Sequence, residues 1–320
     1  MENETPFEST QNYYTRNSSS TSLKFGTKVE PYIRVAKFPK DSIVEIQPLI
    51  DIVSLTLETA FVTDNVDGYR PISLLLIAKP ESGKTTAIHH FATLPFVYYT
   101  EEITVKVLVD KVLRRAENKE IRFILIPDLL NCVKKQTYTR EPLIQTLKSL
   151  VDEGIKNIET WHKQFSYKTF VKCGLITAIT RSEFYAYQGR YSLYSDLKRY
   201  GFLSRMIPFS YEYPIDKLMK IFEYVMSGKA EDNSQVVIPK IRQFKSEKSY
   251  EPNYELFSKL LPISQKLASY MDAYGIRTQK NLQKLCYANA LLNNRDYVSK
   301  EDVEKVLYLG RWMNFDFNPL

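Results

Sequence analysis

The sequence predicts an α/β fold in which helices cover both faces of a parallel sheet, followed by an all-helical C-terminal segment. Segments of helical periodicity alternate with apolar runs, which is typical of parallel sheets because their strands are buried on both faces. After residue 253 the helical pattern continues without an apolar strand. The apolar runs that predict the strands are 74–77, 122–126, 174–179 and 206–211.

The predicted helices have recognisable starts and spacings. Ser42 and Glu45 have the spacing of a capping box, Pro48 suits a first helical turn, and apolar residues then recur at helical intervals up to Phe61. A second start of this kind lies at Ser299. The other predicted elements are helix 85–92, strand 96–99 and helices 105–115, 143–151, 256–270 and 282–292.

The composition of the 320-residue chain excludes several classes of protein. Hydrophobic residues make up 44% and charged residues 25%, as in globular proteins, and no apolar run is long enough to span a membrane. The N-terminus lacks the apolar segment of a secretory signal. Because no apolar run is that long, we expect no membrane partner. Because Cys132, Cys173 and Cys286 are scattered, we expect no zinc site or disulfide framework, and a cytoplasmic location. The net charge of +7 is compatible with a nucleic-acid partner.

The most informative segment is LLLIAKPESGKTT, residues 74–86. An apolar strand, a turn and the start of a helix are the setting of a phosphate-binding loop, in which backbone N–H groups surround an anion. The lysine then reaches the outer phosphates and the following threonine ligates Mg²⁺. One departure is Ala78, which replaces a glycine of the pattern and lacks its access to positive φ. The predicted nucleotide contacts are Pro80, Glu81, Ser82, Gly83, Lys84, Thr85 and Thr86.

Polar residues also follow other predicted strands. Asp128 ends RFILIPD, where a carboxylate can hold Mg²⁺ together with Thr85; an aspartate that caps the turn after proline is the alternative. Thr177 and Thr180 lie in GLITAIT, and we favour Thr180 as a γ-phosphate contact because it is nearer the strand tip. Threonine also simply favours strands.

Two arginines complete the set of candidate catalytic residues. Arg205 directly precedes an apolar strand and is placed to reach the phosphate of a neighbouring subunit as an arginine finger. The alternative for Arg205 is a surface salt bridge. Arg277 opens the helix that starts TQKNLQKL, from which we expect it to fold back over the nucleotide.

Taken in order, these motifs resemble the AAA+ ATPases over about residues 42–313. The resemblance is carried by AKPESGKTT, RFILIPD, DEGIKNIETWHKQFSYKTF, GLITAIT, GFLSRM and GIRTQKNLQKLCYANALLNNRDYVSKEDV. The chain is most similar to the branch that holds the minichromosome-maintenance helicases, the MoxR-type ATPases and the magnesium chelatases. This resemblance implies a P-loop NTPase fold with a helical lid, ATP and Mg²⁺ as cofactors, and self-assembly into a ring or filament.

The resemblance also assigns roles to single residues. In that branch a hairpin before the third strand often projects into the ring pore and touches DNA, and residues 158–170 fit such a hairpin. Trp161, Lys163 and Lys168 are its candidate nucleic-acid contacts; a solvated hairpin that packs its Trp on a neighbour is the alternative. The other implied roles are phosphate and Mg²⁺ binding for Lys84 and Thr85, Mg²⁺ binding for Asp128, first sensor for Thr180, trans finger for Arg205 and second sensor for Arg277.

Departures from the family pattern leave hydrolysis open. Leu129 stands where the family has a catalytic glutamate, and Thr180 stands where asparagine is usual. Glu141 and Glu153 are candidates to substitute for that glutamate. Three functions are therefore weighed: an oligomeric ATPase that acts on DNA or on a DNA-processing protein, a nucleotide-binding scaffold without turnover, and a DNA-binding module with a vestigial phosphate loop.

The predicted organisation has four parts. Residues 1–28 are expected to form a flexible polar tail and residues 29–227 an AAA+-like nucleotide-binding α/β domain. Residues 228–250 are polar and poorly periodic, so we expect a linker or insertion there, followed by a helical lid over residues 251–320.

Overall fold

The computed structural model describes residues 32–33, 46–64, 68–134, 137–160, 163–188, 191–227, 238–241 and 247–320. Contacts divide the chain into two compact units, Met1–Glu30 and Pro31–Leu320, and all described residues belong to the second. The predicted tail, the capping box at Ser42 and most of the predicted linker lie outside the described residues. Within the described part, none of the helices combines the length and apolar character needed to cross a membrane.

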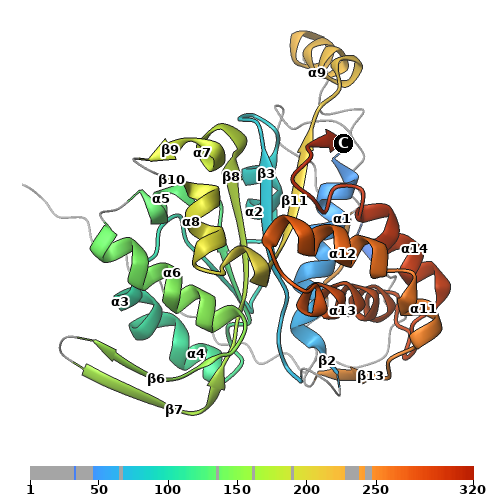
Figure 1. Ribbon diagram of the computed structural model, residues 1–320. Helices are drawn as coiled ribbons and strands as arrows, with labels where there is room; N and C mark the ends of the chain where they lie inside the picture. The colour runs from blue at the N-terminus through green and yellow to red at the C-terminus, as the bar shows by residue number, and fades with distance from the viewer. Residues whose placement is uncertain are drawn as a thin grey trace, which may run out of the picture. The chain divides into compact units, whose positions relative to one another are not determined.

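A six-stranded sheet forms the centre of this unit, and all of its pairings are parallel (Figure 1). Its spatial order is β14-β11-β3-β8-β5-β4. The predicted α/β class with a parallel sheet is therefore confirmed, because the four apolar runs coincide with its four longest strands. The strands are β3 (Ser73–Ala78), β4 (Val97–Tyr99), β5 (Phe123–Ile126), β8 (Gly174–Thr180), β11 (Met206–Glu212) and β14 (Asn318–Pro319).

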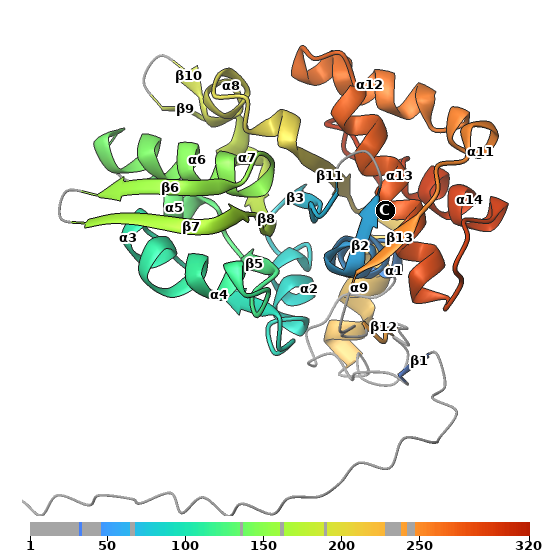
Figure 2. The ribbon, with the colours of Figure 1, turned by 90° about the horizontal axis from the view of Figure 1, so that it is seen from below.

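Helices lie on both faces of the sheet. The helix α2 (Lys84–His90) follows β3, packs on β3 and β8, and contacts α1 (Gln47–Glu58). Figure 2 shows α6 (Thr137–Val151) and α7 (Arg181–Tyr185) on the other side of these strands. The chain runs from β3 to the edge strand β4 in one direction across the sheet, and from β8 past β3 to β11 in the opposite direction. Right-handed crossovers therefore place the two connections on opposite faces. A crevice therefore opens between the loops after β3 and β8, the usual ligand position in open parallel sheets.

The remaining elements of the α/β part are mostly short, apart from the strand β7 and the helix α9. The predicted helix 105–115 is one continuous run that contains a π-helical middle. An antiparallel hairpin of β6 and β7 projects from the end of α6 (Figure 1). The bounds are η1 (Thr59–Phe61), β2 (Val62–Asp64), α3 (Val105–Val107), η2 (Leu108–Leu113), α4 (Arg114–Glu117), α5 (Leu130–Val133), β6 (Ile155–Thr160), β7 (Lys163–Val171), β9 (Tyr187–Gln188), β10 (Tyr191–Ser192), α8 (Leu193–Arg199), η3 (Leu203–Arg205) and α9 (Ile215–Ser227).

The C-terminal segment is mainly helical, but it differs from the prediction at two points. The predicted helix 256–270 is two helices, because Pro262 begins a new one. The predicted capping box is present at Ser299, whose N–H donates to Asp302 Oδ2 at 2.7 Å. Residues 318–319 form β14 and extend the sheet beside β11, so the segment is not purely helical. The helices are α11 (Tyr254–Ser258), α12 (Leu261–Met271), α13 (Ile276–Leu292) and α14 (Lys300–Leu309), and α13 packs along α1.

Short strands that pair with each other outside the central sheet include those at both described parts of the predicted linker. The strand β1 (Tyr32–Ile33) pairs with β12 (Ile238–Pro239) in antiparallel register. The strand β13 (Lys248–Tyr250) pairs with β2 in parallel register. The described parts of the predicted linker are thus paired with β1 and β2, which come early in the sequence.

Candidate functional site

The β3–α2 loop (residues 79–83) turns the chain from a buried strand into a helix. Gly83 has φ 82° as the N-cap of α2, and Glu81 has φ 59°. Ala78 is the last residue of β3, is fully buried and is not among the residues of positive φ. The expected backbone cost of replacing the first glycine of the pattern therefore does not arise at Ala78. The strain lies at Glu81, where a non-glycine residue adopts a left-handed conformation.

The side chain of Lys84 fills the inside of this loop. It is 7% exposed, and burial lowers the pKa of its ammonium group to about 8, against the opposing effect of the Asp128 and Glu183 carboxylates. A buried cation that is held only by neutral oxygens is ready to exchange them for an anion. Its Nζ donates to Ala78 O at 3.1 Å, Lys79 O at 2.6 Å and Ser82 Oγ at 2.9 Å.

Two threonines and an aspartate are the other predicted ligand contacts close to Lys84. Thr85 is exposed in the first turn of α2, and Thr86 is half-buried. Asp128 follows β5, and its Oδ1 accepts a hydrogen bond from Leu130 N at 2.9 Å. Asp128 therefore caps the turn, which was the alternative to a metal role, and also acts electrostatically on Lys84. Among the described residues, no group of three or more His, Cys, Asp or Glu side chains is arranged as a metal site.

Thr180 ends β8, which lies between β3 and β5. Its Oγ1 donates to Glu183 Oε2 at 2.7 Å, and Glu183 Oε1 lies 3.4 Å from Lys134 Nζ. Thr177, in contrast, is fully buried within the sheet. The structure therefore brings Thr180 and Glu183 toward Lys84 together with Asp128.

Glu183 is the residue that sequence reasoning missed. Of the two carboxylates considered as substitutes for the absent glutamate, Glu141 accepts from Tyr200 Oη and Glu153 pairs with Arg205. Neither acts on Lys84, whereas Glu183 does. The available signal was the Thr-x-x-Glu spacing of Thr180 and Glu183, which marks the start of a helix directly after a strand tip.

An open cavity of about 500 Å³ lies beside the β3–α2 loop. It lies where the fold opens a crevice between the loops after β3 and β8. The cations Lys79 and Arg181 both border it, and each of them lies 3.4 Å from Glu212 Oε2. Its lining residues are Lys79, Pro80, Arg181, Ser182 and Tyr185.

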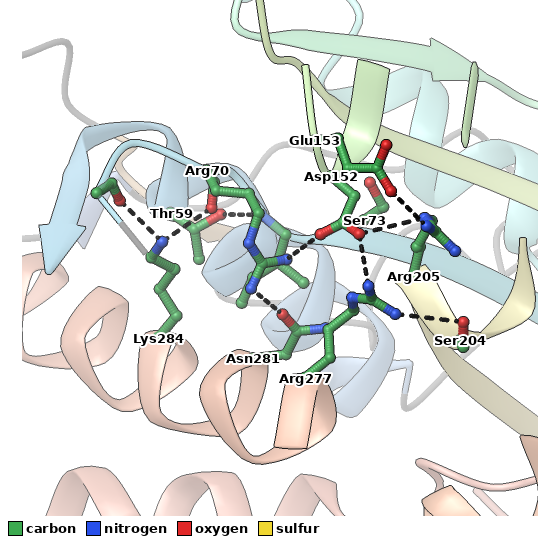
Figure 3. A network of polar contacts seen from close by, with 12 residues as sticks. Thr59, Arg70, Ser73, Asp152, Glu153, Ser204, Arg205, Arg277, Asn281 and Lys284 are labelled. Carbon is green, nitrogen blue, oxygen red and sulfur yellow. Dashed lines mark hydrogen bonds and ion pairs between the residues drawn. The ribbon is translucent and has the colours of Figure 1, made fainter. Parts of the chain in front are cut away.

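Arg205 and Arg277 meet at one carboxylate away from this loop (Figure 3). Arg205 Nε lies 3.2 Å and Arg277 Nη2 2.7 Å from Asp152 Oδ2. Arg205 Nη2 also lies 3.0 Å from Glu153 Oε1. Arg70, whose side chain is 5% exposed, lies at the other oxygen of Asp152 at 3.9 Å. One carboxylate thus faces three guanidinium groups.

These arginines lie at the N-terminal ends of the parallel strands, whereas the β3–α2 loop lies at their C-terminal ends. Arg205 precedes Met206, which pairs with Ser73 at the start of β3, whereas the loop follows the end of β3. The first and last residues of β3 are five steps apart, or about 17 Å at ~3.3 Å per residue. The structure therefore brings Arg277 to Arg205 and not to the loop of its own chain, unlike the expectation that it folds back over the nucleotide.

The β6–β7 hairpin carries exposed basic and aromatic side chains. Lys168 is exposed, while its backbone N–H donates to Glu117 Oε1 of α4 at 2.5 Å. Phe170 is 61% exposed, and Lys156 Nζ lies 5.8 Å from its ring centroid. Trp161 and the side chain of Lys163 lie outside the described part of the chain.

Comparison of the chain with protein-family models and with curated protein sequences finds no match in either set. The site therefore has to be interpreted from its own geometry and chemistry.

Proposed function

We propose that this chain is an AAA+-type protein that binds ATP and Mg²⁺ at the β3–α2 loop, with its C-terminal helices acting as a lid. The observation that carries the proposal is the position of Lys84: its buried ammonium rests on loop oxygens, at a helix start in the crevice of a parallel sheet. A triphosphate offers this cation charged oxygens in place of neutral ones.

The surrounding residues have complementary roles in this proposal. Lys84 would leave Ala78 O and Lys79 O for the outer phosphates. Thr85 and Asp128 would hold Mg²⁺, which when bound neutralises phosphate charge. Glu183, oriented by the hydroxyl of Thr180, would accept a proton from the attacking water.

We also propose self-assembly, and the separation of the two arginines from the loop of their own chain supports it. Arg205 and Arg277 lie at the opposite end of the strands from the loop, so they would complete the site of a neighbouring copy in a ring or filament. We propose that such an assembly acts on DNA or on a DNA-processing protein, and that Trp161, Lys163 and Lys168 of the hairpin contact DNA.

ATP turnover tests this proposal. We expect the wild type to release phosphate, and Lys84→Ala, Glu183→Gln and Arg205→Ala to release at least tenfold less. Glu183→Gln should still bind ATP, because it keeps the shape of the side chain. Turnover in the wild type no greater than in Lys84→Ala would contradict the ATPase function.

A second candidate function is a nucleotide-binding scaffold without turnover. It is favoured by Leu129, which is 1% exposed and part of the core, so no carboxylate follows Asp128 in the position the family uses. Tight ATP binding by the wild type without phosphate release would support the scaffold over the ATPase.

A further inference from the structure

Two tyrosines at the end of β11 hold a single carbonyl of the β3–α2 loop. Tyr211 Oη donates to Ser82 O at 2.8 Å, and Tyr213 Oη donates to the same oxygen at 2.7 Å. A carbonyl oxygen has two lone pairs, so this pair of phenols saturates it. The register explains the contact: Ser210 lies opposite Ile77, so the residues after it reach the loop that follows β3.

The two bonds determine where the next amide points. Across a planar trans peptide the C=O and N–H point in opposite directions, so an oxygen of Ser82 turned toward β11 turns the N–H of Gly83 away from it. This N–H belongs to the start of α2, where amides lack partners within the helix. Because Gly83 has no Cβ, its backbone accepts several orientations, and an outside contact has to select one.

We propose that Tyr211 and Tyr213 are positioning residues that aim the Gly83 N–H at the phosphate chain of the bound nucleotide. This inference rests on the proposed function and deepens it. The pattern for such loops has two glycines and this chain has one, so the loop relies on side chains from a neighbouring strand. Burial raises the pKa of both phenols above its usual value, so both hydroxyls stay protonated as donors.

The variants Tyr211→Phe, Tyr213→Phe and their double variant remove the hydroxyls and keep the rings. Tyr250→Phe is the matched control, because Tyr250 is a buried tyrosine whose hydroxyl donates to Arg295 O at 2.8 Å, in a part of the fold away from the loop. All four proteins and the wild type are titrated with ATP and Mg²⁺, and separately with adenosine.

We expect the double variant to bind ATP about 10–100-fold more weakly, the range for one amide hydrogen bond to a charged group. Its affinity for adenosine should stay unchanged, because that ligand has no phosphate. Tyr250→Phe should match the wild type with both ligands.

A spectroscopic readout separates positioning from a loss of stability. The chain has 10 glycines, and only Gly83 and Gly228 follow a serine, so ¹⁵N-glycine with ¹³C-carbonyl serine selects two amide signals. The Gly83 signal should shift when ATP and Mg²⁺ are added to the wild type and to Tyr250→Phe. In the double variant this shift should be lost.

The outcomes are distinguishable. If the wild type binds ATP and the double variant binds it equally tightly with the same Gly83 shift, the positioning role is overturned while nucleotide binding stands. If the wild type shows neither ATP binding nor a Gly83 shift, the proposed function fails and the positioning role fails with it.

Discussion

Lys84 carries a charge that is almost out of contact with water. Burial lowers its pKa to about 8, because the charged form loses hydration that the loop oxygens only partly replace. Phosphates would raise that pKa in the complex, since negative charge favours the ammonium form. Binding above about pH 8 therefore has to be accompanied by uptake of a proton.

The affinity for ATP and Mg²⁺ should consequently depend on pH. We expect it to be constant up to about pH 8 and then to fall by as much as tenfold for each further pH unit. Titrations between about pH 7 and pH 9.5 check this prediction. In Lys84→Arg the cation stays protonated, so its weaker binding should not change with pH. The same flat profile in the wild type would contradict the account.

At the scale of elements, Asp152 joins three segments that are distant in sequence. It follows α6 and pairs with Arg70, with Arg205 of η3 and with Arg277 of α13 (Figure 3). It also lies three residues before the start of β6, so the arginine cluster is next to the base of the hairpin in the sequence.

Replacing that carboxylate should be costly. We expect Asp152→Asn to lower the free energy of unfolding by about 2–4 kcal/mol, because it leaves half-buried and buried guanidinium groups without their anion. The neighbouring Glu153 is 67% exposed, and Glu153→Gln should change stability by less than about 0.5 kcal/mol. Urea unfolding measures both values, and equal losses in the two variants would contradict the importance of Asp152.

The hairpin offers a second prediction at this scale. We expect single-stranded DNA to bind the wild type in a salt-dependent manner, and Lys156→Ala with Lys168→Ala to reduce the slope of log K against log salt by about 0.7 per lost phosphate contact. Lys300 is a distant lysine whose side chain is 71% exposed, and Lys300→Ala should leave the slope unchanged. An unchanged slope in the hairpin variant as well would remove these lysines from the DNA contact.

The four strands that apolar runs predicted are almost uniformly buried. Every residue of β3 is buried, so its apolar run was readable without knowledge of its neighbours. The edge strand β14 was missed because two residues carry no periodicity, and only their pairing with β11 makes them a strand. The position of Arg277 depends on how α13 packs, which no local spacing determines.

At the scale of the whole chain, the candidate phosphate site and the arginine cluster lie at opposite ends of the strands of one sheet. In a closed ring or an open filament of identical subunits, head-to-tail contacts would bring the arginine cluster of one subunit against the phosphate site of the next. Lys79 and Arg181 line the cavity beside the loop and both pair with Glu212, and the negative charge of a bound triphosphate would attract the arginines of the next copy to this end of the strands.

Nucleotide should therefore change the assembly state. We expect light scattering to show a larger species with ATP and Mg²⁺ than without, and Arg205→Ala to remain at the smaller size. Arg115 is an exposed arginine paired with Glu120, and Arg115→Ala should assemble as the wild type does. A mass that is independent of nucleotide, or assembly by Arg205→Ala, would refute a role for Arg205 between subunits.

The central claim is that the β3–α2 loop and Lys84 hold a triphosphate. Calorimetric titration of the wild type and Lys84→Ala with ATP, in the presence of Mg²⁺, tests it most directly. The account predicts saturable binding at one site per chain by the wild type and a loss of at least tenfold in Lys84→Ala. A wild type that binds neither ATP nor GTP would contradict it.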